Sequence, residues 1–485
     1  MRVIVGSAER APVISSAVVL GALALLSLTV FTGSRPLEAA PVIAVTIVFA
    51  VAYRTLLSWE SLLAVLVLVI LFIPMQRYVL PGSLPFELEP YRLLVGLVFA
   101  GWLASLLVDP RVRLRRSGLE APILLLMVAT FGSILANGGR VAGLESDVAK
   151  SVTFFVSFVL IFYLIVSVVR TRAQVDLLLK FLIGGAAILA GLAIVESRTG
   201  YNVFNHLSGF VPLLEPADVL GTFEQDRGLR AYASAQHPIA LGAALVMLIP
   251  PAIYLVRRTA QRRWWLAAGL LGLGSLATLS RTSVIMLVVV GVVFLRMRPM
   301  ETRRVLPYLL PALVAVHLVL PGTLGTLKES FFPAGGLIAE QTANPGSRGQ
   351  GRIADIGPGL REFAEKPLFG QGYGTRVVDF NRQNAQILDD QWLGTLLETG
   401  LAGAVGWLWL FSRAGRRLAR RARADSSSDG WLLTALTASV ATFAVGMLTY
   451  DAFAFIQGNL LLFILLGLGS ALLRLTSPEP VLPRP

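Results

Sequence analysis

Apolar runs of roughly 17–25 residues recur along the whole chain, and polar intervals separate them. Helices of that length cross a bilayer with every backbone group bonded internally. The pattern predicts an all-α, polytopic integral membrane protein with about fourteen spanning helices. The first run is expected to be a retained span, because no small-residue cleavage site follows it. The expected spans are 13–31, 39–57, 60–74, 92–108, 120–136, 151–169, 175–196, 238–256, 264–280, 283–296, 305–320, 391–412, 431–449 and 453–473.

Composition supports a membrane protein and excludes several kinds of covalent link and metal site. The 485 residues are 55% hydrophobic and only 15% charged, which is too little charge to cover a soluble protein of this size. The chain has no cysteine, so disulfides and thiolate metal sites are excluded. Its three histidines are far apart and lack metal-ligand spacing. We therefore expect no metal and no cofactor.

The net charge of +13 is concentrated in alternate short loops. Lys and Arg in short loops mark the cytoplasmic side of a membrane protein, and both termini are expected on that side. The excess charge is then a feature of topology, with anionic lipid headgroups as neighbours, and a nucleic-acid partner is not expected. The basic segments are 111–116, 170–172, 257–263, 296–304 and 413–423.

The opposite side receives the long loops, near 74–91, 197–237 and 321–390. The last is about seventy residues long, and long ordered loops are usually functional. We therefore expect the site on the non-cytoplasmic face. The chain has no evident internal repeat, which disfavours an alternating-access transporter built from repeats.

Two arginines on this face are not explained by the orientation rule. Arg230 precedes His237 and Pro238, and a proline suits the first turn of the following helix. Arg281 follows Ser280 at a tight turn between two apolar runs. Either arginine could hold a phosphate by paired hydrogen bonds. The alternatives are a loop or capping role for His237 and an interfacial arginine at Arg281.

The long loop contains a third candidate region. Apolar residues recur at helical spacing after Arg352, and Gly357-Pro358-Gly359 is expected to bend or break that helix. The segment 370–374, GQGYG, is expected to form a tight turn or to let backbone approach a ligand.

Carboxylates follow at the next span. Asp389 and Asp390 stand at its start, and Asp389 is the expected helix N-cap, a role that would explain it without catalysis. Glu398, in an apolar helix, requires a partner such as Arg281 or Arg230. Gly400, Gly403 and Gly406 predict a face for close helix packing.

Taken in order, these pieces resemble the O-antigen ligase and polysaccharide polymerase superfamily. The resemblance rests on five segments and covers roughly residues 225–415. The segments are Arg230 with His237-Pro238, Ser280-Arg281, Arg352 to Ile356, Pro367 to Gly372 and Leu396 to Gly403. It implies a division into N-terminal spanning helices at 1–200, a ligase/polymerase-like core at 201–420 and a C-terminal helix pair with a tail at 421–485.

The resemblance implies a metal-independent membrane glycosyltransferase of the GT-C type in the bacterial cytoplasmic membrane. Its partners would be a polyprenyl-diphosphate-linked oligosaccharide, an acceptor glycan or glycolipid, membrane lipids and a chain-length regulator. Arg230, Arg281 and Arg352 would bind the diphosphate, with His237 and Glu398 in support. Ligases carry a histidine where this chain has Asp389, so Asp389 is the expected base and Asp390 the alternative.

Three functions remain open at this point. The missing histidine favours a polymerase over a ligase. A transporter of lipid-linked glycan should place charges in the middle of its spans, whereas here they stand mostly at span ends. A structural assembly subunit would leave the outward-facing arginines unexplained.

Overall fold

The computed structural model describes residues 58–80, 89–109, 112–211, 214–216, 224–225, 228–336, 338–339, 352–377, 384–385 and 388–476. The expected spans at 13–31 and 39–57 lie outside them. The chain divides into two compact units, Met1–Leu66 and Val67–Pro485. The described part of the first unit is the short stretch 58–66, and the fold described below belongs to the second unit.

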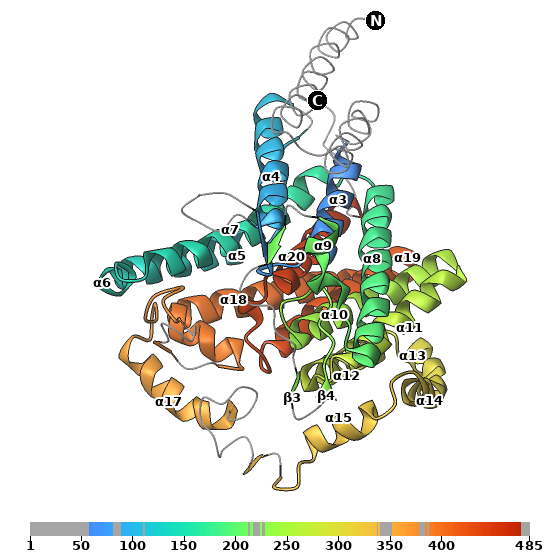
Figure 1. The fold of residues 1–485 in the computed structure, drawn as a ribbon. Coiled ribbons are helices and arrows are strands. Elements are labelled where there is room, and N and C mark those ends of the chain that lie inside the picture. Colours follow the sequence, from blue (N-terminus) through green and yellow to red (C-terminus); the bar gives the residue numbers. More distant parts are fainter. Residues whose placement is uncertain are drawn as a thin grey trace, which may run out of the picture. The chain divides into compact units, whose positions relative to one another are not determined.

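The described chain is mostly helical, which confirms the all-α prediction (Figure 1). Each expected span within the described residues falls on a helical segment. The helices are α3 (Trp59–Phe72), α4 (Pro90–Val108), α5 (Glu120–Ala136), α6 (Gly138–Val141), α7 (Glu145–Val168), α8 (Arg172–Thr199), α9 (Leu207–Phe210), α10 (Pro238–Thr259), α11 (Arg262–Ala277), α12 (Arg281–Met297), α13 (Pro299–Val305), α14 (Leu309–Val319), α15 (Thr323–Phe331), α17 (Arg352–Glu365), α18 (Gln391–Arg423), α19 (Ser428–Gly446) and α20 (Ile456–Leu475).

Two short antiparallel ribbons accompany the helices. Strand β1 (Tyr78–Val79) pairs with β2 (Glu215–Pro216), and β3 (Glu224–Gln225) pairs with β4 (Gly228–Leu229). The first ribbon joins the segment after α3 to the segment after α9, so two of the long loops expected on one face do meet.

Within the described residues, eight helical segments are long and apolar enough to cross a membrane. They include α7, α8, α10, α18, α19 and α20. The protein is therefore a polytopic helical membrane protein. The total of about fourteen spans and the GT-C architecture stay predictions.

Helices α10, α19 and α20 form the centre of the second unit. Between 78% and 94% of the spanning part of each is buried, because each is apolar around its whole circumference. Small residues bring the neighbouring helices close: a side chain at Gly467 of α20 would meet Ile165 of α7. By contrast, the segment Pro299–Val319 is only 6% buried and packs at the periphery.

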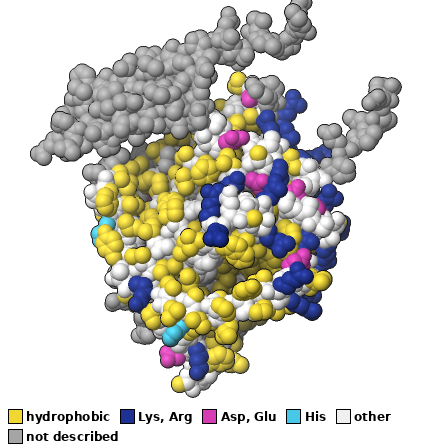
Figure 2. All heavy atoms as spheres, turned by 90° about the vertical axis from the view of Figure 1, so that its right-hand side faces the viewer, with side chains coloured by type: hydrophobic (Ala, Val, Ile, Leu, Met, Phe, Trp, Pro, Cys, Tyr) yellow, Lys and Arg dark blue, Asp and Glu magenta, His cyan; other side chains and the backbone are white. Residues whose placement is uncertain are grey.

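Hydrogen bonds join the connecting segments into two separate groups. At one end, the arginine-rich segments bind one another: Arg413 Nε donates to the Gly118 carbonyl at 2.6 Å, and Arg172 Nε contacts Asp429 Oδ1 at 2.6 Å. We call this the basic end. In the space-filling view, Lys and Arg gather mainly along one side of a face that is otherwise largely hydrophobic (Figure 2).

The segments expected on the opposite face are bonded to one another in the same way. Arg77 Nη1 donates to the Ala233 carbonyl at 2.7 Å, and Gln391 N donates to the Met447 carbonyl at 2.8 Å. We call this the site end. The grouping agrees with the predicted alternation of loops.

Helix α17 corrects one prediction. It runs from Arg352 to Glu365 without interruption and contains Pro358 in its interior, so of the expected bend or break the break does not occur. Proline removes one backbone bond from a helix. The helix nevertheless continues, and Gly359 on its inner face approaches Leu393 so closely that an added Cβ would lie 2.9 Å from that side chain.

Candidate active site

The site is built around a break in α18. Gly400 has φ 66° and ψ −159°, so the helix is interrupted there and its local hydrogen-bond ladder is lost. The turn at 367–371 replaces the missing partners. Leu401 N donates to the Pro367 carbonyl at 2.8 Å, Ala402 N donates to the Leu368 carbonyl at 3.1 Å, and Gln371 N donates to the Leu397 carbonyl at 2.8 Å.

Two glycines permit this docking. Gly400 and Gly370 both have positive φ, a conformation that other residues rarely adopt. A Cβ on Gly370 would lie 2.6 Å from the Leu397 carbonyl oxygen, and a Cβ on Gly400 would lie 2.5 Å from the Leu368 carbonyl. The glycine-rich turn therefore brings backbone against α18. Gly406 fulfils the packing role predicted for it, since it faces Leu126 of α5.

The break places Glu398 at the site end of α18. Its carboxylate accepts a hydrogen bond from the Gly374 amide, and its electrostatic neighbours include Asp451, Arg376 and Arg140. The expected pairing of Glu398 with Arg281 or Arg230 is therefore wrong. The turn at 367–377, docked on the break, brings a different arginine to it.

Asp390, and not Asp389, is the N-cap of α18. Its Oδ1 accepts from Trp392 N at 2.8 Å and from Leu393 N at 3.2 Å. The N-cap expected at Asp389 is wrong by one residue, because the helix begins at Gln391. Asp389 is thereby released from that capping role, and its carboxylate faces Asp451.

Asp451 lies in the connection between α19 and α20, directly after Tyr450. Burial, and after it the neighbouring Asp389 carboxylate, raises the pKa of Asp451 to about 7, while Arg376 acts in the opposite direction. Asp389 is thus the acidic neighbour of Asp451. Arg376 also forms an ion pair with Glu362 of α17 at 2.8 Å.

Arg230 and Arg281 both lie at a second part of the site, the turn between α11 and α12. Arg230 Nε donates to the Thr278 carbonyl at 3.1 Å, and Arg281 opens α12 three residues later. Arg281 Nη1 also donates to the Ser330 carbonyl of α15 at 3.1 Å. Both side chains are at least nine-tenths buried, with 7% and 6% exposed. We call them the arginine pair.

A buried network holds the segment that carries Arg230. The Glu196 carboxylate accepts from Ala233 N at 2.8 Å and from Tyr232 N at 3.3 Å. Arg77 donates to the carbonyls of Ala233 and Ala235 and lies 4.2 Å above the centre of the Tyr232 ring. Burial lowers the pKa of Arg77 to about 10. This bracing fixes the backbone that positions Arg230.

His237 caps α10, which is the capping role predicted for it as the alternative to a role in the site. Its Nδ1 accepts from Ile239 N at 3.2 Å, and Pro238 occupies the first turn. The ring also stacks on Phe455 with centroids 5.6 Å apart. His237 thus contacts the connection that contains Asp451.

The connection 447–455 joins the arginine pair to the carboxylates. Thr449 Oγ1 bonds Thr282 Oγ1 at 3.0 Å, directly beside Arg281. On its other side, Phe453 N donates to Gln391 Oε1 at 2.6 Å, next to the Asp389–Asp390 pair. Arg281 and the Asp389–Asp390 pair therefore lie on two sides of one short segment, and Asp451 lies within it.

Arg352 begins α17, but its side chain lies outside the described residues. Beside α17, a cavity of about 540 Å³ is lined by residues of that helix, of the segment after it and of α18. Its polar lining residues are Asp355, Glu362, Arg376 and Asn384. Carboxylates and amides of this kind suit the hydroxyls of a sugar.

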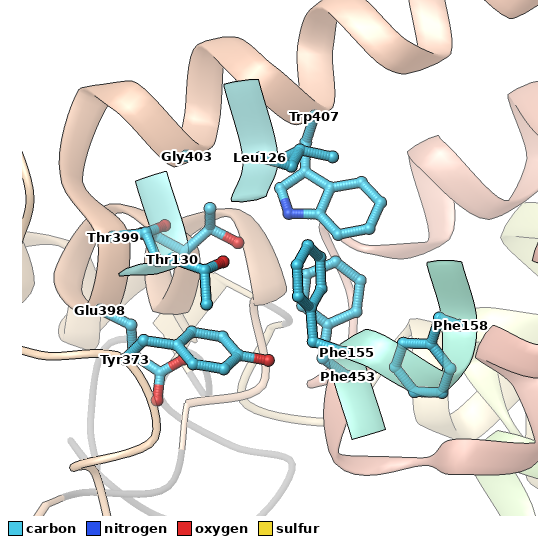
Figure 3. Close-up of a pocket in the computed structure, with 11 residues that line it drawn as sticks. Leu126, Thr130, Phe155, Phe158, Tyr373, Glu398, Thr399, Gly403, Trp407 and Phe453 are labelled. Carbon is cyan, nitrogen blue, oxygen red and sulfur yellow. The ribbon is translucent and has the colours of Figure 1, made fainter. Parts of the chain in front are cut away.

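A second, narrow crevice reaches Glu398 from the helix bundle (Figure 3). Its free space is about 20 Å³, roughly that of one water molecule. Glu398 and Tyr373 lie side by side at one end, and aromatic rings form the other. Burial, then the Glu398 charge, raises the pKa of Tyr373, so its hydroxyl stays protonated. The rings are Phe155, Phe158, Trp407 and Phe453.

Sequence reasoning missed Asp451 and Arg376. Asp451 has one local signal, a carboxylate between two strongly apolar helices on the side assigned to the site. Arg376 is likewise a cation on that side, a position that the orientation rule does not explain. Among the described residues, no group of three His, Asp or Glu side chains is arranged to hold a metal ion.

The structure is thus that of a multi-spanning helical protein whose connections gather arginines and carboxylates at one end. Residues 266–408 match the family model described as O-antigen ligase, which spans α11 to the middle of α18 and includes the break. The match confirms the resemblance to the O-antigen ligase and polysaccharide polymerase superfamily over these residues. It supports a glycosyl-transfer enzyme that acts on surface glycans. No curated protein matches the chain.

Proposed function

We propose that this protein transfers a glycan from a polyprenyl-diphosphate carrier to an acceptor sugar at the outer face of the bacterial cytoplasmic membrane, and so polymerises a surface polysaccharide. The observation that carries the proposal is the pairing of two opposite charge groups at the site end. The connection 447–455, which contains Asp451, is bonded on one side to Thr282, next to Arg281, and on the other side to Gln391, two residues after Asp389.

The arginine pair is suited to a leaving diphosphate. A guanidinium presents its donors in a fixed fork that matches phosphate oxygens, and a buried one interacts more strongly with charge than an exposed one. Arg230 and Arg281 are each anchored to backbone carbonyls, so their orientation exists before substrate binds. Preorganised cations of this kind stabilise developing negative charge without a metal. Arg352 is the third candidate.

The carboxylates supply the base. Asp389 takes the proton of the acceptor hydroxyl, the acceptor oxygen forms a bond to the anomeric carbon, and the bond from that carbon to the diphosphate oxygen breaks. The diphosphate leaves with the bonding electrons beside the arginines. Asp389 lies beside Asp451, and one of its carboxylate oxygens is buried, so it can accept the proton within a site shielded from water. Asp390 is the weaker candidate because its Oδ1 is engaged in capping α18.

A ligase is the second candidate, since the matching family model is described as O-antigen ligase. A ligase would attach the finished glycan once to a different lipid or surface acceptor. The cavity beside α17, with its sugar-suited lining, serves either acceptor. The aspartate where ligases carry a histidine favours the polymerase. A transporter is less favoured, because the charged groups gather at helix ends.

The test is transfer in liposomes. The purified protein is reconstituted with the host's polyprenyl-diphosphate oligosaccharide, with and without EDTA, and the products are separated by size. A ladder of lengthened glycans establishes the polymerase, and a single added glycan on a supplied lipid acceptor establishes the ligase. Carrier movement across the bilayer without any new glycosidic bond would contradict both and would leave the transporter.

Two variants link the reaction to the site. Asp389→Asn is expected to abolish transfer at normal expression, because the amide cannot accept the proton. Glu301→Gln, in α13 near the basic end, is the matched control and should transfer normally. Normal transfer by Asp389→Asn at wild-type protein levels would remove Asp389 from the base role.

A further inference from the structure

A groove of about 340 Å³ lies on α18 at the basic end, far along the helix from the break. It is lined by Trp409 and four arginines of the same helix, Arg413, Arg416, Arg417 and Arg420. Steps of three and four residues separate most of these positions, so they share one side of α18. None of the four forms a salt bridge with a carboxylate among the residues that the structure describes.

Two of these arginines are fixed in place. Arg413 Nε donates to the Gly118 carbonyl at 2.6 Å, and Arg417 Nη1 donates to the Ser117 carbonyl at 2.6 Å. Neutral carbonyls orient the guanidinium groups but do not neutralise them. Glu120 is the acidic neighbour of Arg417, and its Oε1 already accepts from Ser117 Oγ and from Gly118 N. The groove therefore keeps a strong excess of positive charge.

The other two arginines are open to a ligand. Arg416 and Arg420 stand one helical turn apart, and both side chains are exposed. Guanidinium groups in this arrangement bind the oxygens of a phosphate group.

An apolar stripe leads into the groove along the same side of α18. Leu401, Val405, Leu408 and Trp409 are 47%, 52%, 60% and 36% exposed, so this side of α18 presents an uncovered apolar surface. Such a surface does not contribute to the binding of a free phosphate ion, whereas an acyl chain can pack against it. Tryptophan at the junction of apolar and charged surface is typical of the membrane interface.

We propose that this groove binds the phosphate of an anionic phospholipid, whose acyl chain lies along Leu401, Val405 and Leu408. The lipid is held at the basic end and is separate from the glycan donor and acceptor. It bridges Arg416 and Arg420 to the fixed arginines and so supplies the negative charge that the groove lacks.

Quenching of tryptophan fluorescence tests the proposal. The full chain, freed of lipid, is titrated with phosphatidylglycerol carrying brominated acyl chains, and then with phosphatidylcholine carrying the same chains. Phosphatidylglycerol is expected to quench at lower mole fractions, and Trp409→Phe is expected to remove the component that responds to the headgroup. Equal quenching by the two lipids would overturn the proposal.

A matched pair of double variants tests the arginines. Arg416→Gln/Arg420→Gln should weaken the phosphatidylglycerol response by roughly thirtyfold, since each arginine near an anionic headgroup contributes about 1 kcal/mol, which is a factor of about five. Arg303→Gln/Arg304→Gln removes the same charge from exposed positions of α13, also near the basic end, and should change little. Equal losses in both variants would indicate general charge attraction and would overturn a specific site.

Inorganic phosphate separates a lipid from a soluble anion. The proposal expects millimolar phosphate to leave the brominated-lipid response unchanged, because the acyl chain contributes to binding. If phosphate abolishes the response, the groove is a site for a soluble anion and the lipid assignment is wrong.

Discussion

Gly400→Ala tests whether the break in α18 holds the site together. The glycine has φ 66° and ψ −159°, a region that is almost restricted to glycine. Placing alanine there costs about 1–3 kcal/mol in backbone strain. The new Cβ would also lie 2.5 Å from the Leu368 carbonyl and 2.7 Å from Gly370 N, so the turn at 367–371 has to move.

Movement of the turn removes up to three backbone hydrogen bonds, each worth about 1 kcal/mol net. These bonds oppose the displacement in wild type and variant alike, so the strain of about 1–3 kcal/mol sets the change: relief of about 2 kcal/mol raises the fraction of molecules with a displaced turn by roughly thirtyfold. Glu398 and Arg376 would separate at the same time. Glycan transfer should therefore fall sharply, even if the spanning helices remain folded.

Thiol labelling provides the assay because the chain has no cysteine of its own. Thr375 is fully buried behind the turn, so Thr375→Cys should react slowly with an aqueous maleimide. Adding Gly400→Ala should accelerate labelling at least tenfold. Gly415→Ala is the control, since Gly415 lies in the same helix with no atom within 4 Å of an added Cβ. Unchanged labelling and transfer in Gly400→Ala would refute the structural role of the break.

Three further predictions concern individual groups. Asp451→Asn should raise the melting temperature more at pH 8 than at pH 5. The folded-state pKa of Asp451, about 7, is above the ordinary carboxyl value, so the stability that this carboxyl contributes is lost as pH rises from about 4 to 7. The neutral amide avoids that loss. Equal changes in the melting temperature at both pH values would contradict this. Arg281→Lys should lower the transfer rate by roughly a hundredfold because it keeps the charge but loses the guanidinium fork; a rate within twofold of wild type in the liposome assay would argue against phosphate contact. Arg77→Gln should destabilise the protein by about 3 kcal/mol, because it removes contacts to two backbone carbonyls and a buried charge beside Glu196. A melting temperature equal to that of wild type would show that this network does not brace the Arg230 segment.

The sequence by itself determined the helical membrane class and the positions of the described spans. Both follow from local physics, since a long apolar run must form a helix in lipid whatever surrounds it. It also determined that the connections form two groups, because charge alternates from loop to loop. The capping role of His237 with Pro238 was readable for the same reason, as a helix start depends on adjacent residues.

The superfamily was readable from the order of short motifs, and the match at residues 266–408 confirms it. The motifs did not reveal why their glycines are needed. Only the tertiary structure shows that Gly370 and Gly400 allow the turn to replace backbone bonds lost in α18. The two segments are about thirty residues apart, and neither has a local pattern that specifies the other.

The tertiary structure also decided which charged groups meet. Sequence spacing placed the N-cap at Asp389 and paired Glu398 with Arg281 or Arg230. In the structure Asp390 is the cap, Asp389 faces Asp451, and Glu398 has Arg376 and Arg140 as its cationic neighbours. Electrostatic partners are set by how helices pack, and packing joins residues across any distance in the chain. A sequence pattern therefore identifies the charges that need partners, and the fold selects the partners.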